Sequence, residues 1–397
     1  MNRDQKNEVN SYLKQNLGIS VKDIIAVKRL SLIKEMVNSP CPCCDSDDYF
    51  FISNKDRYDI PSQQVFCNFC GMFYFNPRPT EESLKKFYNL ESERYRFTDC
   101  VDEYFKINYE GHQHEEHRLK IHQLINKKTT NNGRNQSEEH VPSHKGEIFQ
   151  DYAEELFEEA SRLVQEPVYV FEVGAANGNM LLPWKRHGDR VGGMEWDALK
   201  AKSALTHFGI ELVSDWPSDF SENVKRPDVV LLLRTLEHML HPHLELTKIK
   251  QNLKTNGLLV VDVPDTINNC RVGGFVAESR IDHLNMYTKN TLSRQLVRAG
   301  FTPLSVKSFS TLGHSSGIGE RFYLRAIARN EEMIGSFVPI VAPAQDLAEM
   351  LSIEIEQAPR LRNAIRRKAK RHKKTSPRSH LWRHCSDFLN NKFRREP

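Results

Sequence analysis

The chain has 397 residues, a formal net charge of +4 and 39% hydrophobic residues. This length provides for one α/β domain of about 200 residues with smaller attachments. The longest aliphatic run, Val229 to Leu233, falls far short of the about 20 apolar residues of a membrane helix, and the polar N-terminus lacks the apolar core of a signal peptide. We therefore expect a cytoplasmic protein with no transmembrane segment.

The first 80 residues divide into two parts. Residues 1–36 alternate charged and aliphatic side chains, which predicts an N-terminal extension of one or two short amphipathic helices. Residues 37–80 contain five of the eight cysteines. So few cysteines in a long chain are atypical of a disulfide scaffold, and their clustering favours metal binding in a reducing compartment.

Two C-x-x-C pairs carry the metal prediction. Cys41 and Cys44 form the first pair and Cys67 and Cys70 the second, with 22 residues between the pairs. Each pair can place two thiolates on one tight turn, and two such turns complete a tetrahedral zinc shell. Four sulfur ligands leave no open position, so we predict a structural zinc ion that holds together a segment too small for its own core. Cys43 is the alternate ligand, at a less suitable offset.

The next two segments are predicted to connect domains. Residues 81–126 are expected to form a helical connector or lid, whose first helix follows two prolines and is capped by Thr80. Residues 127–145 have almost no apolar side chain to bury, which predicts a flexible linker.

Strand and helix patterns alternate over residues 146–330. The expected strands are 168–173, 190–194, 210–213, 228–233, 257–263, 303–308 and 320–328. Alternation at this spacing predicts an α/β domain with a doubly wound, Rossmann-like and largely parallel sheet, whose ligand sites lie beyond the C-terminal ends of the strands.

The first of these strands ends in a small-residue loop. Gly174 and Gly178 allow a positive φ or a close approach of a ligand to the backbone, and Ala175 and Ala176 keep the turn uncluttered. Glu195 follows at the end of the next expected strand, where a carboxylate can accept both hydroxyls of a ribose. The loop and the carboxylate together indicate a nucleoside-containing cofactor.

The loop resembles the acidic-x-Gly-x-Gly-x-Gly motif of class I S-adenosylmethionine-dependent methyltransferases, with Glu172 in the acidic place and Ala176 in place of the middle glycine. The resemblance covers about residues 168–328. It implies S-adenosylmethionine as the cofactor, bound by the loop and by Glu195 through its ribose.

The same resemblance implies further cofactor contacts. Asp215 falls at the family's adenine-contacting acid, with Trp216 beside it as an apolar neighbour of the ring, and the alternative for Asp215 is an ordinary loop acid. Arg234 opens a segment similar to the family's Leu-Glu-His-x-x-x-Pro segment, which faces the cofactor in that fold. His238, His241 and His243 in this segment lack a carboxylate or thiolate set for a metal and are interpreted as surface histidines with satisfied hydrogen bonds.

Methyl transfer is an in-line displacement, so the protein must align the acceptor and, for a hydroxyl or carbon acceptor, remove a proton. Asp282 and His283 offer a carboxylate and an imidazole for this task. Their segment resembles the Asp/Glu-His segment of deoxysugar C-methyltransferases, which also begin with a cysteine-ligated zinc domain. That resemblance implies His283 as the general base and Asp282 as a positioning group. Arg280 departs from it, standing where that family has a tyrosine, and the alternative for His283 is a packing role.

The last segment, residues 331–397, is predicted to be a helical basic tail. Between Arg360 and Pro397, fourteen Lys and Arg stand against two acids. Such a tail is typical either of a solvated extension or of a segment that binds an anionic partner, RNA or a membrane surface.

Three hypotheses for function follow. The first is a methyltransferase for a small-molecule acceptor, such as a nucleotide-linked sugar in surface polysaccharide biosynthesis. The second is an RNA methyltransferase that binds RNA with the cysteine segment and the tail, although the Asn/Asp-Pro-Pro-Tyr/Phe motif of base-methylating enzymes is absent. The third is a non-catalytic module on the same fold, which Ala176 suggests.

Overall fold

The computed structural model of the protein describes residues 3–21, 24, 35–56, 61–85, 101–102, 104–105, 115–126, 144–165, 168–222, 225–311, 321–331, 345–350 and 352–353. The predicted linker, except for its last two residues, and the basic tail beyond residue 353 lie outside these ranges. Within them, no helix combines the length and the apolar character that crossing a membrane requires.

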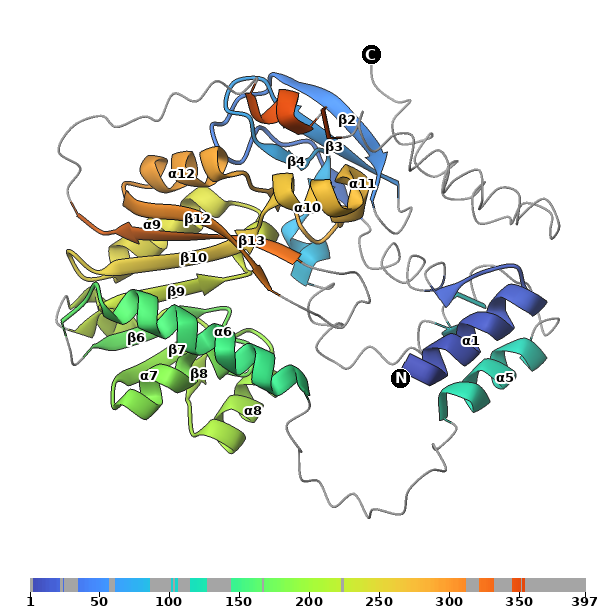
Figure 1. The fold of residues 1–397 in the computed structure, drawn as a ribbon, viewed down its shortest axis with the longest axis horizontal. Helices are drawn as coiled ribbons and strands as arrows, with labels where there is room; N and C mark the ends of the chain where they lie inside the picture. Colours follow the sequence, from blue (N-terminus) through green and yellow to red (C-terminus); the bar gives the residue numbers. More distant parts are fainter. Residues whose placement is uncertain are drawn as a thin grey trace.

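A seven-stranded sheet forms the centre of the molecule, in the order β12-β13-β10-β9-β6-β7-β8 (Figure 1). Its strands are β6 (Tyr169–Val173), β7 (Arg190–Met194), β8 (Leu212–Val213), β9 (Val229–Leu233), β10 (Leu258–Pro264), β12 (Thr302–Thr311) and β13 (Arg321–Arg329). Each of the seven predicted strands is present. The five strands from β6 to β10 are parallel, while β13 is antiparallel to both of its neighbours.

The chain runs from β6 outward to β8 and then returns to β9 on the other side of β6. This reversal is the topological switch point at which doubly wound sheets bind ligands. The expected fold class is confirmed.

Helices cover both faces of this sheet, as Figure 1 shows. The helices are α6 (His144–Ser161), α7 (Leu182–His187), α8 (Ala198–Phe208), α9 (Pro242–Asn252), α10 (Thr266–Gly273), α11 (Phe275–Glu278) and α12 (Lys289–Arg298). Alternate residues of β9 point to opposite faces: Val229 and Leu231 pack in the core that contains α6 and α7, whereas Val230 and Leu232 pack in the core that contains α9 and α12. The strand is apolar throughout because both of its faces are buried.

The cysteine-rich segment, residues 35–79, folds into a small β unit that we call the cysteine module. It comprises β1 (Met36–Val37), β2 (Tyr49–Lys55), β3 (Pro61–Cys67), β4 (Phe73–Phe75) and β5 (Arg78–Pro79). Strands β2, β3 and β4 form a sheet whose fourth strand is β11 (Asn285–Met286), contributed by the central domain. The module therefore shares a sheet with the segment that follows His283.

A described part of the predicted tail also packs on this unit. Residues 345–350 are helical, and Met350 and Ile353 lie in one apolar cluster with Phe66, Phe73 and Phe75 of the module. The predicted tail therefore includes residues that pack against the module.

The predicted N-terminal extension and the predicted connector meet in a separate helical unit. Helices α1 (Arg3–Asn16) and α5 (Glu115–Asn126) lie side by side in Figure 1. Their buried side chains form a cluster with residues between them in the sequence: Val9, Leu13, Ile19, Val21, Ile24, Val101, Tyr104, Phe105, Ile121 and Leu124.

Candidate functional site

The loop after β6 bends where the glycine spacing predicts it. The amides of Gly174 and Ala175 both donate to the carbonyl of Met194 on β7, at 2.9 and 3.0 Å. Gly174 has a φ of +75°, and a Cβ there would lie 2.6 Å from Oγ1 of Thr235, just beyond β9. The loop is therefore packed directly against the end of β9 at the switch point, and only glycine fits at position 174.

Glu195 faces this loop from the end of β7. Its Oε2 accepts a hydrogen bond from the amide of Ala176 at 2.8 Å, and its Oε1 accepts one from the amide of Asp197 at 2.9 Å. Ala176 has a φ of +48°, a left-handed conformation that favours glycine. The structure thus brings together the two features predicted from the sequence, the bend after β6 and the carboxylate of Glu195.

Glu172 lies inside the same strand end. Its side chain is 2% exposed, and its Oε2 has no hydrogen-bond partner among the described residues. Burial raises the pKa of its carboxyl well above the usual value, and the charge of Glu195 raises it further. The carboxyl is therefore a buried hydrogen-bonding group whose Oε2 has no partner in the described part of the chain.

Asp215 and Trp216 follow β8 at the edge of this region. Asp215 is exposed, and its Oδ1 accepts a hydrogen bond from the amide of Trp216 at 2.8 Å. The indole stacks on Phe171 of β6, with ring centroids 5.2 Å apart and planes inclined by 23°. The aromatic side chain is thus fixed, whereas Asp215 has the surroundings of an ordinary loop acid.

Arg234 occupies the end of β9. Its amide donates to the carbonyl of Asp262 at 2.7 Å, and its guanidinium lies over the rings of Tyr152 on α6 and Tyr323 on β13, 5.0 and 4.5 Å from their centroids. These contacts give Arg234 a packing role between α6 and β13. Its predicted contact with the cofactor stays a prediction.

A second group of polar side chains surrounds His283. Ligand atoms of Glu237, His238 and His283 all lie within 4.8 Å of one another. The two imidazole rings meet edge to face with centroids 4.7 Å apart, and Nε2 of His238 lies 3.8 Å from Oε1 of Glu237. His238 is half-buried in this cluster, so its interpretation as a surface histidine is wrong, whereas His241 is exposed.

Asp282 has a different partner from the one that the sequence suggested. Its buried carboxylate forms an ion pair with Arg280, which donates to both of its oxygens. Its backbone carbonyl accepts a hydrogen bond from Nδ1 of His238 at 2.6 Å. The carboxylate that shares a cluster with His283 is Glu237, and Asp282 acts on the cluster through its backbone.

Asn285 holds the two loops of this cluster together. Its Nδ2 donates to the carbonyl of Met239 at 2.7 Å and also lies 3.3 Å from the carbonyl of Leu236 and 3.4 Å from that of Glu237. One buried amide side chain thereby fixes the turn that carries Glu237 and His238 beside the strand that follows His283. Sequence reasoning missed this pairing because the two loops are more than forty residues apart.

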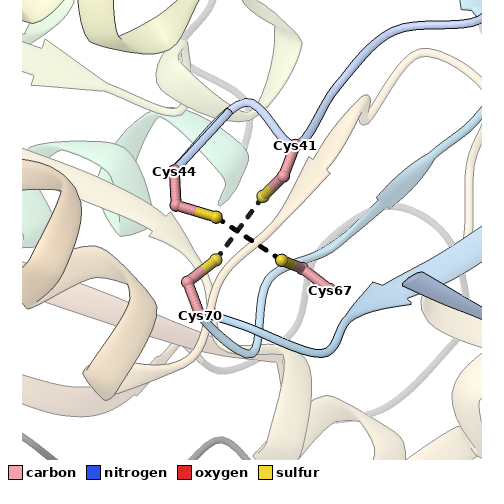
Figure 2. A group of neighbouring side chains, drawn as sticks. All are labelled: Cys41, Cys44, Cys67 and Cys70. Atoms are coloured by element: carbon pink, nitrogen blue, oxygen red, sulfur yellow. Dashed lines mark hydrogen bonds between the residues drawn. The ribbon is translucent and has the colours of Figure 1, made fainter. Parts of the chain in front are cut away.

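The four cysteines of the two pairs converge on one point, as Figure 2 shows. The Sγ atoms of Cys41 and Cys70 are 3.4 Å apart and those of Cys44 and Cys67 are 3.5 Å apart, and all four lie within 4.8 Å of one another. Zinc–sulfur bonds of about 2.3 Å in a tetrahedron place sulfurs about 3.8 Å apart, so the spacing suits a zinc ion and is too long for a disulfide. Cys43 is buried but is not in this group.

Helix α12 binds the backbone of both cysteine turns. Arg298 donates to the carbonyl of Cys43 at 2.6 Å, Arg294 donates to that of Cys70 at 2.8 Å, and Gln295 donates to that of Pro42 at 3.2 Å. The cysteine module is therefore fastened to the central domain at the metal-binding turns themselves as well as through β11.

Residues 144–306 match the model of a protein family described as a methyltransferase domain. The central domain has a methyltransferase fold. The match spans the loop after β6, Glu195 and the Glu237–His238–His283 cluster, and it leaves out the cysteine module. No curated protein sequence matches the chain.

Three solved structures of methyltransferases are each similar to less than half of the chain. A putative methyltransferase from Bacillus halodurans is 13% identical, covering 46% of this chain and 99% of its own, with a TM-score of 0.37. The 1,6-didemethyltoxoflavin-N1-methyltransferase of Burkholderia thailandensis, solved with that compound and S-adenosylhomocysteine, is 16% identical over 48% of this chain and 84% of its own, with a TM-score of 0.35. The N-methyltransferase NodS of Bradyrhizobium japonicum is 15% identical over 48% of this chain and 100% of its own, with a TM-score of 0.34.

Proposed function

We propose that the protein is an S-adenosylmethionine-dependent methyltransferase that acts on a small-molecule acceptor. The observation that carries the proposal is the hydrogen bond from the amide of Ala176 to the carboxylate of Glu195 at the switch point of the sheet. It joins a bend with accessible backbone to an acid suited to a ribose. The family match over residues 144–306 supports the same reaction.

The residues around β6 fit the proposed cofactor. Glu195 retains lone pairs for the two ribose hydroxyls after accepting its two backbone hydrogen bonds. Glu172 offers the buried, unpartnered Oε2 to a donor of the cofactor. Trp216, stacked on Phe171, offers an apolar surface for the adenine, and Gly174 keeps the bend free of side chains. When bound, S-adenosylmethionine supplies an electrophilic methyl group on a sulfonium.

We assign acceptor activation to the cluster around His283. For a hydroxyl acceptor, the oxygen–methyl bond forms as the sulfur–methyl bond breaks, and the hydroxyl proton passes to Nε2 or Nδ1 of His283 as the base. Asp282 is a positioning residue, because its carbonyl fixes the ring of the neighbouring His238. A nucleotide-linked sugar or another precursor of surface polysaccharide is the proposed acceptor class, and RNA is the alternative.

The four cysteines are proposed to hold a structural zinc ion. Cys41, Cys44, Cys67 and Cys70 provide the sulfur-only donor set and the spacing that tetrahedral zinc requires. The ion would close the two turns that α12 binds and would keep β4 in place beside β11. It takes no part in methyl transfer in this proposal.

The decisive experiment is a calorimetric titration of the full-length protein with S-adenosylmethionine. Glu195→Ala should bind S-adenosylmethionine about 100-fold more weakly than wild type, because it loses the hydrogen bonds to both ribose hydroxyls. Glu211→Ala removes an exposed acid near β8 and should bind like wild type. Equal binding by Glu195→Ala and wild type would remove the ribose argument, and the absence of binding by wild type would favour a non-catalytic module.

A screen with labelled cofactor then tests the acceptor. Nucleotide-linked sugars should accept label, and His283→Ala should lower turnover about 100-fold or more without changing cofactor affinity. Label in RNA and not in the sugars would replace the proposed acceptor class by the alternative.

A further inference from the structure

We propose that Glu237, His238 and His283 form a second metal site, distinct from the four cysteines, that binds a divalent transition-metal ion. Two imidazoles and one carboxylate are a donor set that zinc, iron and related ions prefer, and three protein ligands leave positions open for a small molecule. The three ligand atoms already lie within 4.8 Å of one another. They come from the loop after β9 and from the loop before β11.

Glu237 provides the strongest indication of a missing cation. Its side chain is 2% exposed, and its Oε2 has no hydrogen-bond partner among the described residues. A buried carboxylate oxygen without a donor costs about 1–3 kcal/mol or more, so such groups are rare unless a ligand satisfies them. A cation bound by both oxygens of this carboxylate, with Oε1 on the side of His238, would satisfy Oε2 as well.

The separation of the ligand atoms fits a shared ion better than a direct hydrogen bond. Nε2 of His238 and Oε1 of Glu237 are 3.8 Å apart, which is too long for a hydrogen bond. Two ligands of one ion, each bonded at about 2.0–2.2 Å, lie about 3–4 Å apart.

The hydrogen bond of His238 sets the nitrogen that faces the cluster. A carbonyl oxygen can only accept, so the contact between the carbonyl of Asp282 and Nδ1 of His238, at 2.6 Å, requires a proton on Nδ1. The neutral ring then has its lone pair on Nε2, the atom directed toward Glu237. Metal-binding histidines are oriented in this way by a carbonyl or carboxylate on their other nitrogen.

The frame around the three ligands is rigid. Asn285 binds the carbonyls of Glu237 and Met239, and β11 pairs with β4 of the cysteine module. The ligand positions are therefore set by two buried contacts outside the cluster rather than by the ion alone.

The site would change how an acceptor loses its proton. A divalent ion lowers the pKa of a hydroxyl that binds it, so the hydroxyl proton could leave to solvent while His283 serves as a ligand instead of the base. This role in deprotonating the acceptor rests on the proposed function, whereas metal binding itself does not. A failure to bind metal can therefore be distinguished from a failure of the proposed methyl transfer.

The test is a Co²⁺ titration of the full-length protein, from which a chelator has removed the metal acquired during expression, with absorption spectra and metal analysis. Wild type should bind two equivalents of cobalt per chain. One equivalent should show thiolate-to-cobalt absorption and be lost in Cys44→Ala. The other should lack that absorption and be lost in both Glu237→Gln and His238→Ala, while His241→Ala, which changes an exposed histidine of the same loop, should retain both.

A single equivalent in wild type that disappears in Cys44→Ala would overturn the proposal. So would a second equivalent that survives in Glu237→Gln and in His238→Ala. Circular dichroism and thermal unfolding of each variant identify a folding defect, and Glu237→Gln, which keeps the shape of the side chain, serves if His238→Ala fails to fold. Titration of the same variants with S-adenosylmethionine reports on the proposed function independently, because Glu195 is unchanged in all of them.

Discussion

Nη2 of Arg78, in the cysteine module, lies 3.3 Å from Oδ1 of Asn285, the residue that fixes the loops around His283. Nη1 of the same guanidinium donates to the carbonyl of Leu240 at 2.7 Å, on the loop that follows His238. Burial lowers the pKa of Arg78 to about 10, so the side chain remains charged at neutral pH. The module therefore reaches the candidate acceptor site through one buried cation.

Arg78→Met should disturb the acceptor site and leave the cofactor site intact. The substitution leaves the carbonyl of Leu240 and the amide oxygen of Asn285 without their donor, which should lower the free energy of unfolding by on the order of 3 kcal/mol. We expect methyl transfer to fall while the Kd for S-adenosylmethionine changes by less than about twofold. Denaturant unfolding, turnover and calorimetry measure the three quantities.

Arg162→Met, which changes an exposed arginine on the segment after α6, is the matched control and should behave like wild type. A parallel loss of cofactor affinity in Arg78→Met would show that the module supports the whole domain and not the acceptor side alone.

Cys44→Ala and Cys43→Ala compare a predicted ligand with a neighbouring cysteine. Both side chains are at least partly buried in one turn, but only Cys44 belongs to the cluster of four. Cys44→Ala should lose the zinc ion. The amides of β11 should then exchange faster with solvent, because the ion no longer holds the cysteine turn that precedes β4, the strand that pairs with β11. Cys43→Ala should keep zinc and the protection of β11. Zinc analysis and hydrogen exchange of the peptide around Met286 decide, and equal zinc loss in both variants would make Cys43 a ligand as well.

Glu172→Gln should stabilise the protein as the pH rises. The folded-state pKa of Glu172 is raised above its ordinary value of 4.5, chiefly by burial and further by Glu195. The folded protein therefore holds a proton that the unfolded chain releases, so this group's contribution to stability is fully present below about pH 4.5 and declines as the pH rises toward the folded pKa. Glutamine cannot ionise and removes this decline.

Above the folded pKa of Glu172, the same variant should bind S-adenosylmethionine about tenfold less tightly, because a neutral amide then replaces a carboxylate as the acceptor, whereas below that pKa it should bind about as tightly as wild type. Thermal unfolding at pH 5 and pH 8 tests the first effect, and calorimetry tests the second. A gain in stability that is equal at both pH values would contradict an ionising Glu172, and Glu211→Gln controls for the loss of one negative charge.

The sequence predicts the central sheet well because its signals are local. Val229 to Leu233 is apolar throughout since β9 is buried on both faces, and Gly174 marks a bend that admits no side chain. The cysteine cluster is predictable for the same reason: the spacing within each pair fixes the turn. These features depend on a few consecutive residues and very little on the rest of the chain.

The acceptor side depends on contacts between distant segments, which no local pattern records. Strand β11 has only two residues and exists because Asn285 and Met286 pair with Tyr74 and Phe73 of the module. The sequence does not reveal the surroundings of His238, because its partners, Asp282 and His283, lie more than forty positions later in the chain. The sequence signal for this cluster is the Glu237-His238 pair after a buried strand. This signal indicates the loop but does not indicate that Asp282 and His283 lie beside it.

Ala176→Gly tests why the loop after β6 tolerates a departure from the glycine motif that it resembles. Ala176 has a φ of +48°, the left-handed conformation that a glycine adopts without strain. An L-residue there costs about 1–2 kcal/mol, and glycine loses about 0.5–1 kcal/mol more in conformational entropy on folding, so the variant should be more stable by up to about 1.5 kcal/mol. Its amide still reaches Glu195, so the affinity for S-adenosylmethionine should stay within about twofold of wild type.

Gly174→Ala is the matched change at the other end of the bend. Its Cβ would lie 2.6 Å from Oγ1 of Thr235 at a φ of +75°, so we expect a loss of stability together with a loss of cofactor affinity. Denaturant unfolding and calorimetry compare the two variants. If Ala176→Gly destabilised the protein as Gly174→Ala does, the left-handed conformation of Ala176 would be wrong. If Ala176→Gly strengthened the binding of S-adenosylmethionine many-fold, the native alanine would impair the cofactor loop. This result would favour the hypothesis of a non-catalytic module.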